Sequence, residues 1–398
     1  MASVPCSTLT RDGELYWLAL HLVPGLGVRK THRLIEEFGG PPSVFRASRS
    51  ELESVGLATS TAQSIASGCI FEDATTQHQK MLAARAQLIT FTDDQYPALL
   101  REIYDPPLVL FARGNPELLN DVNVAIVGTR RPSAYGMVAA ERLATDLAAA
   151  GVTVVSGMAR GIDTKAHTAV LDNQGNTVAV FGCGVDVIYP AENRKLADRI
   201  AEKGLLLSEF PMGAPGLPQN FPVRNRIVSG MCAGVIVVEG AQYSGSTITA
   251  KLALDQNREV FAIPGNITSK LSWAPNLLIK QGAKLVQDAN DVLTELPEQD
   301  RARLAQRHRQ RLLELERIEH PEQEKENKGV FSADDPMAPA KSGLLRTLTF
   351  DKPANLDHLM EVLEGNSASE LIAALFELEL LGLVRQLPGK NFIKVWTD

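Results

Sequence analysis

Short apolar runs, each closed by glycine and followed by a helical pattern, recur through the middle of this chain. These runs are rich in valine and isoleucine, and the strands they predict lie near residues 122–127, 152–156, 177–181, 205–208, 234–239, 259–263 and 284–286. Near-continuous apolar strands that alternate with helices are typical of a parallel sheet covered on both faces. Residues 86–297 are therefore predicted to form a doubly wound α/β domain.

The first part of the chain, residues 1–85, shows a purely helical pattern instead. An amphipathic segment over residues 14–22 is followed by a Pro-Gly-Leu-Gly turn at residues 24–27 and by a second helical segment. Two helices joined by so tight a turn are typical of a helix-hairpin-helix or SAM-like unit, and a weaker copy of the pattern follows. Such a hairpin binds phosphates through its N–H groups, here with Arg29 and Lys30 beside them, but a helical packing or protein-binding module fits the pattern equally well.

Charged residues dominate after the α/β region. Residues 298–341 carry only scattered apolar positions and are predicted to form a linker that is helical at its start. A core pattern returns over residues 342–398, where three helical segments and a final hairpin give the outline of a winged-helix domain. The third helical segment carries Glu370, Glu377 and Glu379 and neither Lys nor Arg. Because phosphates repel an acidic helix, a protein-binding or regulatory role is favoured over groove reading.

Composition and charge argue against a metal-stabilised, disulfide-linked or membrane-spanning protein. The chain has 398 residues and a formal net charge of −7, so a nucleic-acid contact requires a local basic patch. Its four cysteines lie far apart, with neither CxxC nor His spacing, which argues against a zinc site or a disulfide framework. The sequence shows neither a signal-peptide pattern nor a run of about 18 uncharged apolar residues. We therefore expect a cytoplasmic protein with no membrane partner.

Ligands of a doubly wound sheet bind beyond the carboxyl ends of its strands, where loop N–H groups and helix N termini converge. Six predicted loops open onto this edge, and the cations they carry are Arg130, Arg131, Arg160, Arg224, Arg226 and Lys270. After the first central strand, Gly128 lets the chain turn sharply, so that the next amides and Arg130 can reach an anion. Gly245 and Ser246 offer similar donors at the start of another helix. Both loops are typical of phosphate binding.

Aromatic residues are interleaved with these cations: Tyr135, Tyr189, Phe210, Phe221, Tyr243 and Trp273. Unpaired bases stack on such rings while arginines hold the backbone, a combination used to bind single-stranded nucleic acid. Phe221 stands next to Asn220 and close to Arg224, so it is predicted to contact bases. For Tyr189 and Phe210, a role as core anchors at the base of a loop is favoured.

No catalytic constellation is evident from the sequence. Asp163, His167 and Cys183 do not combine into a nucleophile, a base and an orienting group, and they are interpreted as a helix cap, a hydrogen-bonded helix residue and a packed small side chain. The GTRRPSAYG loop lacks the GxGxxG of dinucleotide-binding enzymes, and the GxxxxGK[ST] of P-loop ATPases is absent. We therefore predict a protein without enzymatic activity or cofactor. The alternative is an enzyme or sensor that binds a free nucleotide in the same pocket.

Several ordered motifs of the α/β region together resemble the DNA-processing protein A family, also called DprA or Smf, of bacterial transformation proteins. The segments that carry the resemblance are GTRRPS, SGMARGIDTKAH, GCGVDVIYP, LLLSEFPMGAPGLPQNFPVRNRIVSG, VIVVEGAQYSGSTITAKLAL, REVFAIPGNI and LIKQGAKLV. The resemblance implies an extended Rossmann-like domain flanked by a helical N-terminal domain and a winged-helix domain. It also implies a protein that binds single-stranded DNA, forms homodimers and helps to load the recombinase RecA onto incoming strands in natural transformation and homologous recombination.

Together with the loops described above, the resemblance gives the predicted DNA-binding residues: Gly128, Thr129, Arg130, Arg131, Gly157, Arg160, Gly161, Asn220, Phe221, Arg224, Asn225, Arg226, Ser244, Gly245 and Ser246. Thr129 stands where the family commonly has serine, and it keeps the hydroxyl group. Leu277 stands where the family usually has arginine, which lowers the contribution expected from the loop after Pro264. If these residues form one interface, their cationic groups must share one rim of the sheet.

Overall fold

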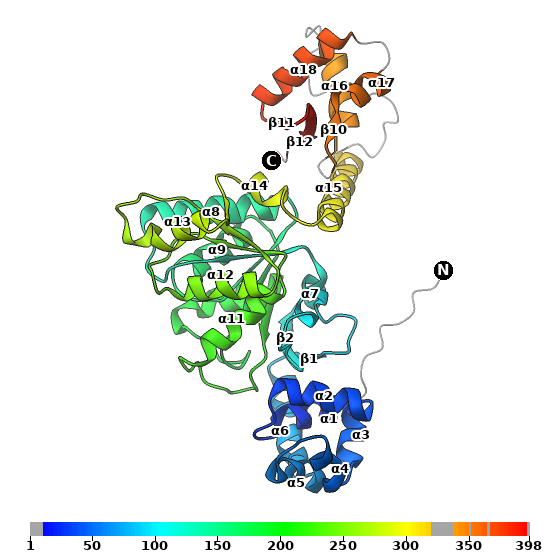
Figure 1. The fold of residues 1–398 in the computed structure, drawn as a ribbon, viewed down its shortest axis with the longest axis vertical. Helices are drawn as coiled ribbons and strands as arrows, with labels where there is room; N and C mark the ends of the chain where they lie inside the picture. Colours follow the sequence, from blue (N-terminus) through cyan, green and yellow to red (C-terminus); the bar gives the residue numbers. More distant parts are fainter. Residues whose placement is uncertain (1–10, 320–336, 350–351, 364–366, 396–398) are drawn as a thin grey trace. The chain divides into compact units, whose positions relative to one another are not determined.

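The structure is a computed structural model that describes residues 11–319, 337–349, 352–363 and 367–395 (Figure 1). The chain forms two compact units. The first unit contains residues 1–145 and 153–285, and the second contains residues 146–152 and 286–398. Within the described ranges, no helix is long and apolar enough to span a bilayer.

The first unit begins with a group of helices that bury a shared apolar core. These helices are α1 (Arg11–Leu22), α2 (Val28–Phe38), α3 (Pro41–Arg46), α4 (Arg49–Ser54), α5 (Thr59–Ser67) and α6 (Phe71–Ala83). The turn between α1 and α2 requires a positive φ of 74° at Gly25, and the Leu26 N–H closes it by donating to the Val23 carbonyl at 3.3 Å. The weaker copy of the hairpin pattern forms α4 and α5. Both predicted helical turns are therefore present.

A nine-stranded sheet makes up the rest of the first unit, within its described residues. The strands are β1 (Gln87–Thr90), β2 (Val109–Gly114), β3 (Asn123–Val127), β4 (Thr153–Ser156), β5 (Thr177–Val180), β6 (Leu205–Ser208), β7 (Gly234–Val237), β8 (Glu259–Ala262) and β9 (Lys284–Leu285). Their order is β1-β2-β6-β5-β4-β3-β7-β8-β9, and the strands from β6 to β9 are all parallel. The predicted doubly wound α/β fold is confirmed. The antiparallel pairing of β2 with β1 and β6 at one edge is an addition to it.

Helices cover both faces of the parallel strands. The helices and helical turns of this region are α7 (Ala98–Arg101), η1 (Pro116–Asn120), α8 (Ala134–Ala149), α9 (Ile162–Asp172), η2 (Ala191–Asn193), α10 (Arg194–Lys203), α11 (Asn220–Gly230), α12 (Gly245–Asp255), η3 (Lys270–Ser272) and α13 (Trp273–Lys280). Val178 and Val180 of β5 pack in the core under α11, α12 and α13, whereas Ala179 packs in the core with α9 and α10. This alternation follows from the two-residue period of a strand.

The sheet has a topological switch point between β3 and β7, which are neighbours in space but not in sequence. The chain runs from β3 through β4 and β5 to β6 on one side of this point, and from β7 through β8 to β9 on the other side. The loops after β3 and β7 therefore diverge and leave a crevice at the carboxyl ends of the strands.

The second unit contains α14 (Ala289–Leu293), α15 (Glu298–Glu319), α16 (Ala338–Thr347), β10 (Ala354–Asn355), α17 (Leu356–Val362), α18 (Ala368–Leu380), β11 (Val384–Leu387) and β12 (Asn391–Lys394). Its three strands form an antiparallel sheet in the order β10-β12-β11, as expected of a winged helix. Ser367 and Glu370 form a capping box that fixes the start of α18. The start of the predicted linker is helical in α15, and residues 320–336 of that linker lie outside the described residues.

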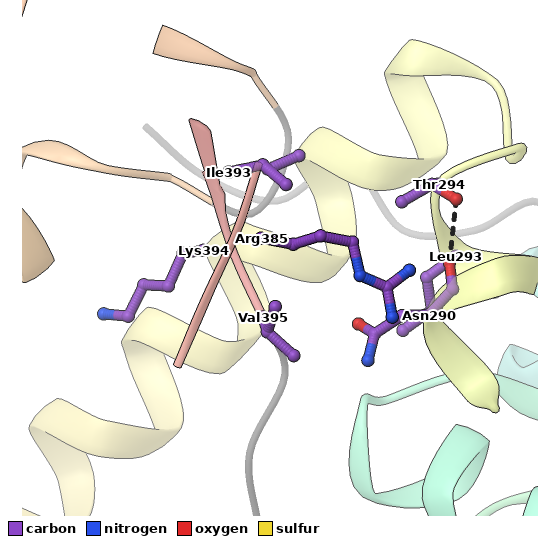
Figure 2. A pocket seen from close by; sticks show the side chains of 7 residues that line it. All are labelled: Asn290, Leu293, Thr294, Arg385, Ile393, Lys394 and Val395. Carbon is purple, nitrogen blue, oxygen red and sulfur yellow. Dashed lines mark hydrogen bonds between the residues drawn. The ribbon is translucent and has the colours of Figure 1, made fainter. Parts of the chain in front are cut away.

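An ion pair ties the winged-helix hairpin to α14 within this unit. Arg385 of β11 lies 3.2 Å from a carboxylate oxygen of Asp288 and 3.7 Å from one of Asp291. Figure 2 shows the Arg385 side chain extended toward Asn290 of α14. Both acidic partners belong to the capping box at the start of α14, so the arginine complements charge that is already fixed by backbone hydrogen bonds.

Candidate nucleic-acid interface

A pocket of about 450 Å³ lies at the switch point of the sheet. We call it the switch-point pocket, and its lining residues are Val127, Gly128, Thr129, Arg130, Gly157, Ala159, Asp163, Tyr189, Pro218, Phe221, Pro222, Arg224, Asn225, Val228, Ser244, Gly245, Ser246, Ile248 and Thr249. They come from the end of β3, from the loops after β3, β4, β5 and β7, from the start of α9, and from α11 and α12 with the segment before α11. Such convergence at the carboxyl edge is the position expected for a ligand.

A cation and two aromatic rings form one wall of the switch-point pocket. The guanidinium carbon of Arg130 lies 5.6 Å from the centroid of the Phe221 ring, and the Tyr189 ring lies 5.3 Å from Phe221 on a tilted plane. Arg130 is exposed and, within the described residues, forms no ion pair. Tyr189 is 42% exposed. This wall offers an uncompensated positive charge next to open ring surface.

Arg224 forms the floor of the switch-point pocket, and it is only 4% exposed. Its Nη1 donates to the Gly157 carbonyl at 2.6 Å and also to the Val180 carbonyl, and its Nε donates to Asn225 at 3.2 Å. Burial lowers the pKa of Arg224 to about 10, and the charge of Asp163 opposes this shift. The guanidinium is thus a fixed positive charge at neutral pH that holds the loop after β4 to α11.

Close backbone approach explains the glycine at position 157. A Cβ atom there would lie 2.6 Å from the nearest guanidinium nitrogen of Arg224. The arginine is anchored by its hydrogen bonds to two carbonyl groups, so it has little freedom to move away. Glycine is therefore needed at this position for the floor of the pocket to form.

The N terminus of α12 also lines the switch-point pocket. Its N-cap, Ser244, makes no side-chain cap to the helix, and the Ser244 hydroxyl pairs instead with Ser246 at 2.7 Å and Thr247 at 3.1 Å. The first amides of a helix carry partial positive charge and lack intrahelical partners. Together with the hydroxyl groups, they form a region suited to an anionic oxygen.

The loop after β3 is more constrained than the sequence indicates. The Thr129 amide donates to the Glu239 carbonyl at 2.8 Å, and the Arg131 amide donates to the Thr129 hydroxyl at 3.2 Å. The expectation that these amides point at an anion is therefore wrong for Thr129 and Arg131. The loop contributes its Arg130 side chain to the pocket instead.

A smaller extension of the pocket, about 20 Å³, lies beside the loop after β4. Met158 in this loop has a positive φ of 60°, a conformation that side chains rarely adopt, and its carbonyl accepts a hydrogen bond from Asn193 at 3.0 Å. Arg160 lines the extension but pairs with Glu192, an interaction that raises the pKa of Arg160. Its charge is therefore compensated on the protein surface.

The three catalytic candidates are structural residues. Asp163 was interpreted from the sequence as a helix cap. In the structure it accepts hydrogen bonds from the Gly157 and Ala159 amides at 3.1 and 3.3 Å, so it anchors the loop before α9 instead of capping the first turn of that helix. Burial raises the pKa of the Cys183 thiol to about 11, and its sulfur donates to the Val187 carbonyl. Neither residue is prepared for nucleophilic or acid–base chemistry.

His167 is fully buried beside β5. The Thr177 hydroxyl donates to the Val154 carbonyl at 2.7 Å, so the His167 Nδ1 must be the donor in its 2.7 Å contact with that hydroxyl. The His167 Nε2 is buried without a partner, and burial lowers the pKa of the imidazole to about 3. His167 is therefore neutral at physiological pH, in agreement with its interpretation as a hydrogen-bonded helix residue.

The structure brings together most of the predicted DNA-binding residues, but it leaves four outside the pocket lining: Arg131, Gly161, Asn220 and Arg226. Arg131 is exposed to solvent. The Asn220 amide donates to the Gly182 and Pro215 carbonyls, so it braces the loops. Gly161, with φ of 78°, allows the approach of the Thr129 carbonyl. These two residues support the pocket from behind.

Arg226 does not lie with the other predicted arginines in the switch-point pocket. Its side chain is buried, its Nε lies 3.2 Å from Asp105, and its Nη2 pairs with Glu209. Residues 224 and 226 are two positions apart on α11, so they point about 200° apart and cannot face the same pocket. Arg226 therefore lies outside the switch-point pocket.

Tyr189 is the main pocket residue that sequence reasoning misplaced. It was expected to be a core anchor, but it is half exposed and stacks with Phe221. Pro218, Pro222 and Ile248 add apolar surface to the lining. The sequence alone does not identify these apolar residues as part of a site, because their position in the pocket depends on how α11 and α12 pack.

The fold and the pocket define a doubly wound α/β protein with its ligand site at the topological switch point. Residues 87–297 match the family model for DNA recombination-mediator protein A, and residues 332–390 match the DprA winged helix domain. The chain belongs to the DNA recombination-mediator protein A family. This result confirms the resemblance that the sequence motifs indicate.

Relatives extend the match over nearly the whole chain. The Smf protein of Synechocystis is 33% identical over 402 residues, which cover 96% of this chain and 99% of that protein. The DprA protein of Bacillus subtilis is 46% identical over 213 residues, which cover 53% of this chain and 72% of that protein. The crystal structure of DprA from Streptococcus pneumoniae has a TM-score of 0.64 and 36% identity, and the alignment covers 73% of this chain and 99% of that one.

Proposed function

We propose that the switch-point pocket binds single-stranded DNA and that the protein acts without catalysis. The observation that carries the proposal is the Arg130 wall, where a cation that pairs with no acid in the described part of the chain lies over Phe221 next to the exposed Tyr189 ring. Bases stack on such rings and phosphates pair with such a cation, whatever the base sequence. Membership in the DNA recombination-mediator protein A family supports the same assignment.

The contacts divide between the two parts of a nucleotide. Phe221 and Tyr189 supply ring faces for a base, whereas Arg130 and the first amides of α12 supply positive charge for phosphates. Buried Arg224 adds a fixed charge from below without requiring direct contact. None of these groups recognises the edge of a base, so we expect little sequence preference.

The first test compares Arg130→Ala with Arg131→Ala. Both variants remove one exposed arginine from the same loop, but only Arg130 lines the switch-point pocket. Because a hydrogen bond to a charged group contributes about 1.5–3 kcal/mol, Arg130→Ala should weaken binding of an oligothymidylate about tenfold to a hundredfold, as measured by fluorescence anisotropy. Its salt slope should fall by about 0.7, the value for one phosphate contact. Equal affinities of the two variants would remove Arg130 from the interface.

A free nucleotide is the competing ligand, because a pocket of this size and charge also fits one nucleotide unit. Calorimetry with thymidine monophosphate and with oligothymidylates separates the two cases. Affinity that rises with strand length supports the single-strand proposal. Tight binding of the mononucleotide, with no gain from added length, supports a nucleotide enzyme or sensor.

Family membership further supports a role in loading RecA onto single strands in transformation and recombination, with the protein acting as a homodimer. The corresponding test follows RecA assembly on a strand that is already covered by single-strand-binding protein. Faster assembly in the presence of the wild-type protein, but not of Arg130→Ala, is the expected result. Sedimentation at several concentrations gives the oligomeric state.

A further inference from the structure

A second groove, of about 660 Å³, lies on the other side of α11 from the switch-point pocket. We call it the hairpin groove because the turn between α1 and α2 forms one of its walls, and its main polar residues are Arg29, Lys30, Tyr104, Asp105, Glu209 and Arg226. The two sites share α11 as a partition. Arg224 and Asn225 line the pocket, whereas Val223 and Arg226 line the groove, as the helical period requires.

The hairpin groove repeats the chemistry of the Arg130 wall. The guanidinium carbon of Arg29 lies 4.2 Å from the centroid of the Tyr104 ring, and its Nη1 also donates to the Tyr104 hydroxyl. Tyr104 is 74% exposed, an unusual degree for so large a ring. Each site therefore presents an exposed arginine and an accessible aromatic ring, the pair that holds phosphates and stacks on bases.

The guanidinium of Arg226 offsets part of the negative charge of the two acidic residues in the hairpin groove. Arg226 lies between Asp105 and Glu209 and pairs with both, and burial raises the pKa of Glu209. Arg226 also lines the groove, and its Nη1 is buried without a hydrogen-bond partner. Arg29 and Lys30 form no ion pair within the described residues, so the groove is left with exposed positive charge at the hairpin.

The walls of the hairpin groove are held together by hydrogen bonds between the helices and the sheet. The His32 Nε2 lies 2.9 Å from the Pro106 carbonyl, and the Met212 amide donates to the Gln77 side chain at 2.8 Å. The ridge between the two sites is formed by Pro222 and Val223, which are exposed and uncharged. A phosphate backbone that crosses this ridge meets no negative side chain on it.

We propose that the hairpin groove is a second binding site for the same DNA strand, which leaves the switch-point pocket over Pro222 and Val223 and continues to Arg29, Lys30 and Tyr104. This inference rests on the proposed single-strand function of the pocket. The strand has to cross the width of α11, about 10–12 Å with side chains, so only a strand longer than the pocket occupies both sites. The helical hairpin then acts as an extension of the interface.

The test uses two oligothymidylates, one of about two nucleotides and one of about twenty, so that only the second is much longer than a pocket that fits about one nucleotide unit. The variant is Arg29→Ala/Lys30→Ala. The matched control is Arg33→Ala/Arg46→Ala, which removes two exposed arginines from the same group of helices but outside the groove. Tyr104→Ala tests the stacking ring separately. Thermal unfolding of each full-length variant confirms that it is folded.

Arg29→Ala/Lys30→Ala should bind the short strand as the wild type does. Two phosphate contacts on a single strand contribute about 1.4 to the slope of log affinity against log salt concentration. If the variant and the wild type bind equally at about 1 M salt, the variant should therefore bind the long strand about 25-fold more weakly than the wild type at about 0.1 M salt. Tyr104→Ala should weaken the long strand about tenfold, within the range for one stacked base. The control should bind both strands normally.

The outcomes separate this inference from the proposed function. If the variant and the control bind the long strand equally well, the groove is not part of the interface, although the pocket remains so. An equal loss for short and long strands also overturns the inference, because the groove then does not act through strand length. If the wild type binds neither strand, the proposed function itself fails.

Discussion

Gly161→Ala tests whether the Arg130 loop is positioned by backbone packing against the start of α9. Gly161 has a φ of 78°, and a Cβ atom on it would lie 2.4 Å from the Thr129 carbonyl oxygen and 2.8 Å from the Arg130 carbonyl carbon. Both neighbours are backbone atoms, so no side-chain rotation relieves the overlap. Ordinary contact begins at about 3.4 Å, so the loop after β3 must move by about 1 Å.

Gly213→Ala is the matched control for this change. Gly213 has nearly the same φ, 80°, but a Cβ atom there meets nothing within 4 Å. Each substitution gives alanine a positive φ, at a cost of about 1–3 kcal/mol, and the ψ of −121° at Gly161 places that residue in a region that is essentially restricted to glycine. Gly161→Ala adds about 1–3 kcal/mol for the steric overlap. The control thus corrects the comparison for the positive φ.

The assay combines urea unfolding with anisotropy on a short oligothymidylate. Both variants should lose stability, Gly161→Ala more than Gly213→Ala. Only Gly161→Ala should bind more weakly, by about tenfold or more, because a charge-assisted contact worth about 1.5–3 kcal/mol is lost when Arg130 moves. If Gly161→Ala binds DNA as well as Gly213→Ala does, the position of the Arg130 loop does not govern binding.

Two further predictions address the stacking ring and the buried histidine. Phe221→Leu keeps an apolar side chain but removes the ring between Arg130 and Tyr189. The affinity for an oligothymidylate should fall about tenfold, within the roughly 1–3 kcal/mol contributed by a stacked base, and the melting temperature should change little. Unchanged affinity would exclude stacking at this position. His167 has a folded pKa of about 3 against 6.5 when unfolded, so the unfolded state binds the proton first and stability is lost as pH falls below 6.5. His167 accounts for about 2 kcal/mol of the loss in unfolding free energy between pH 8 and pH 5. In urea unfolding, the variant His167→Gln should not show this part of the loss. If the wild type and the variant lose stability equally with pH, another group is responsible.

The parallel strands β3 to β7 could be predicted from sequence because each is an apolar run buried on both faces, a pattern that depends on local residues alone. β2 was not predicted, because it follows Pro106 and Pro107 and is joined to β1 without a crossover helix. Its antiparallel pairing with β6 connects segments about ninety residues apart in the chain, and no local period encodes such a pairing.

The candidate site could be predicted at the level of loops but not of every side chain. The pairing of Arg226 with Asp105 depends on a contact between residues far apart in sequence, so its burial is invisible in the sequence. The sequence analysis treated residues 224 and 226 as part of a loop, whereas the structure places them on α11, where residues two positions apart cannot share a face. Tyr189 was misplaced because its partner Phe221 lies on the first turn of α11, which only the fold brings near it.

The central claim is that a single strand occupies the switch-point pocket against Phe221 and Tyr189. Photocrosslinking with an oligonucleotide of about six residues that carries 5-iodouracil, followed by peptide mapping, tests it most directly. The account predicts adducts on Phe221 or Tyr189, and their loss in Arg130→Ala. Adducts confined to residues outside the switch-point pocket, such as those of α18, would contradict it.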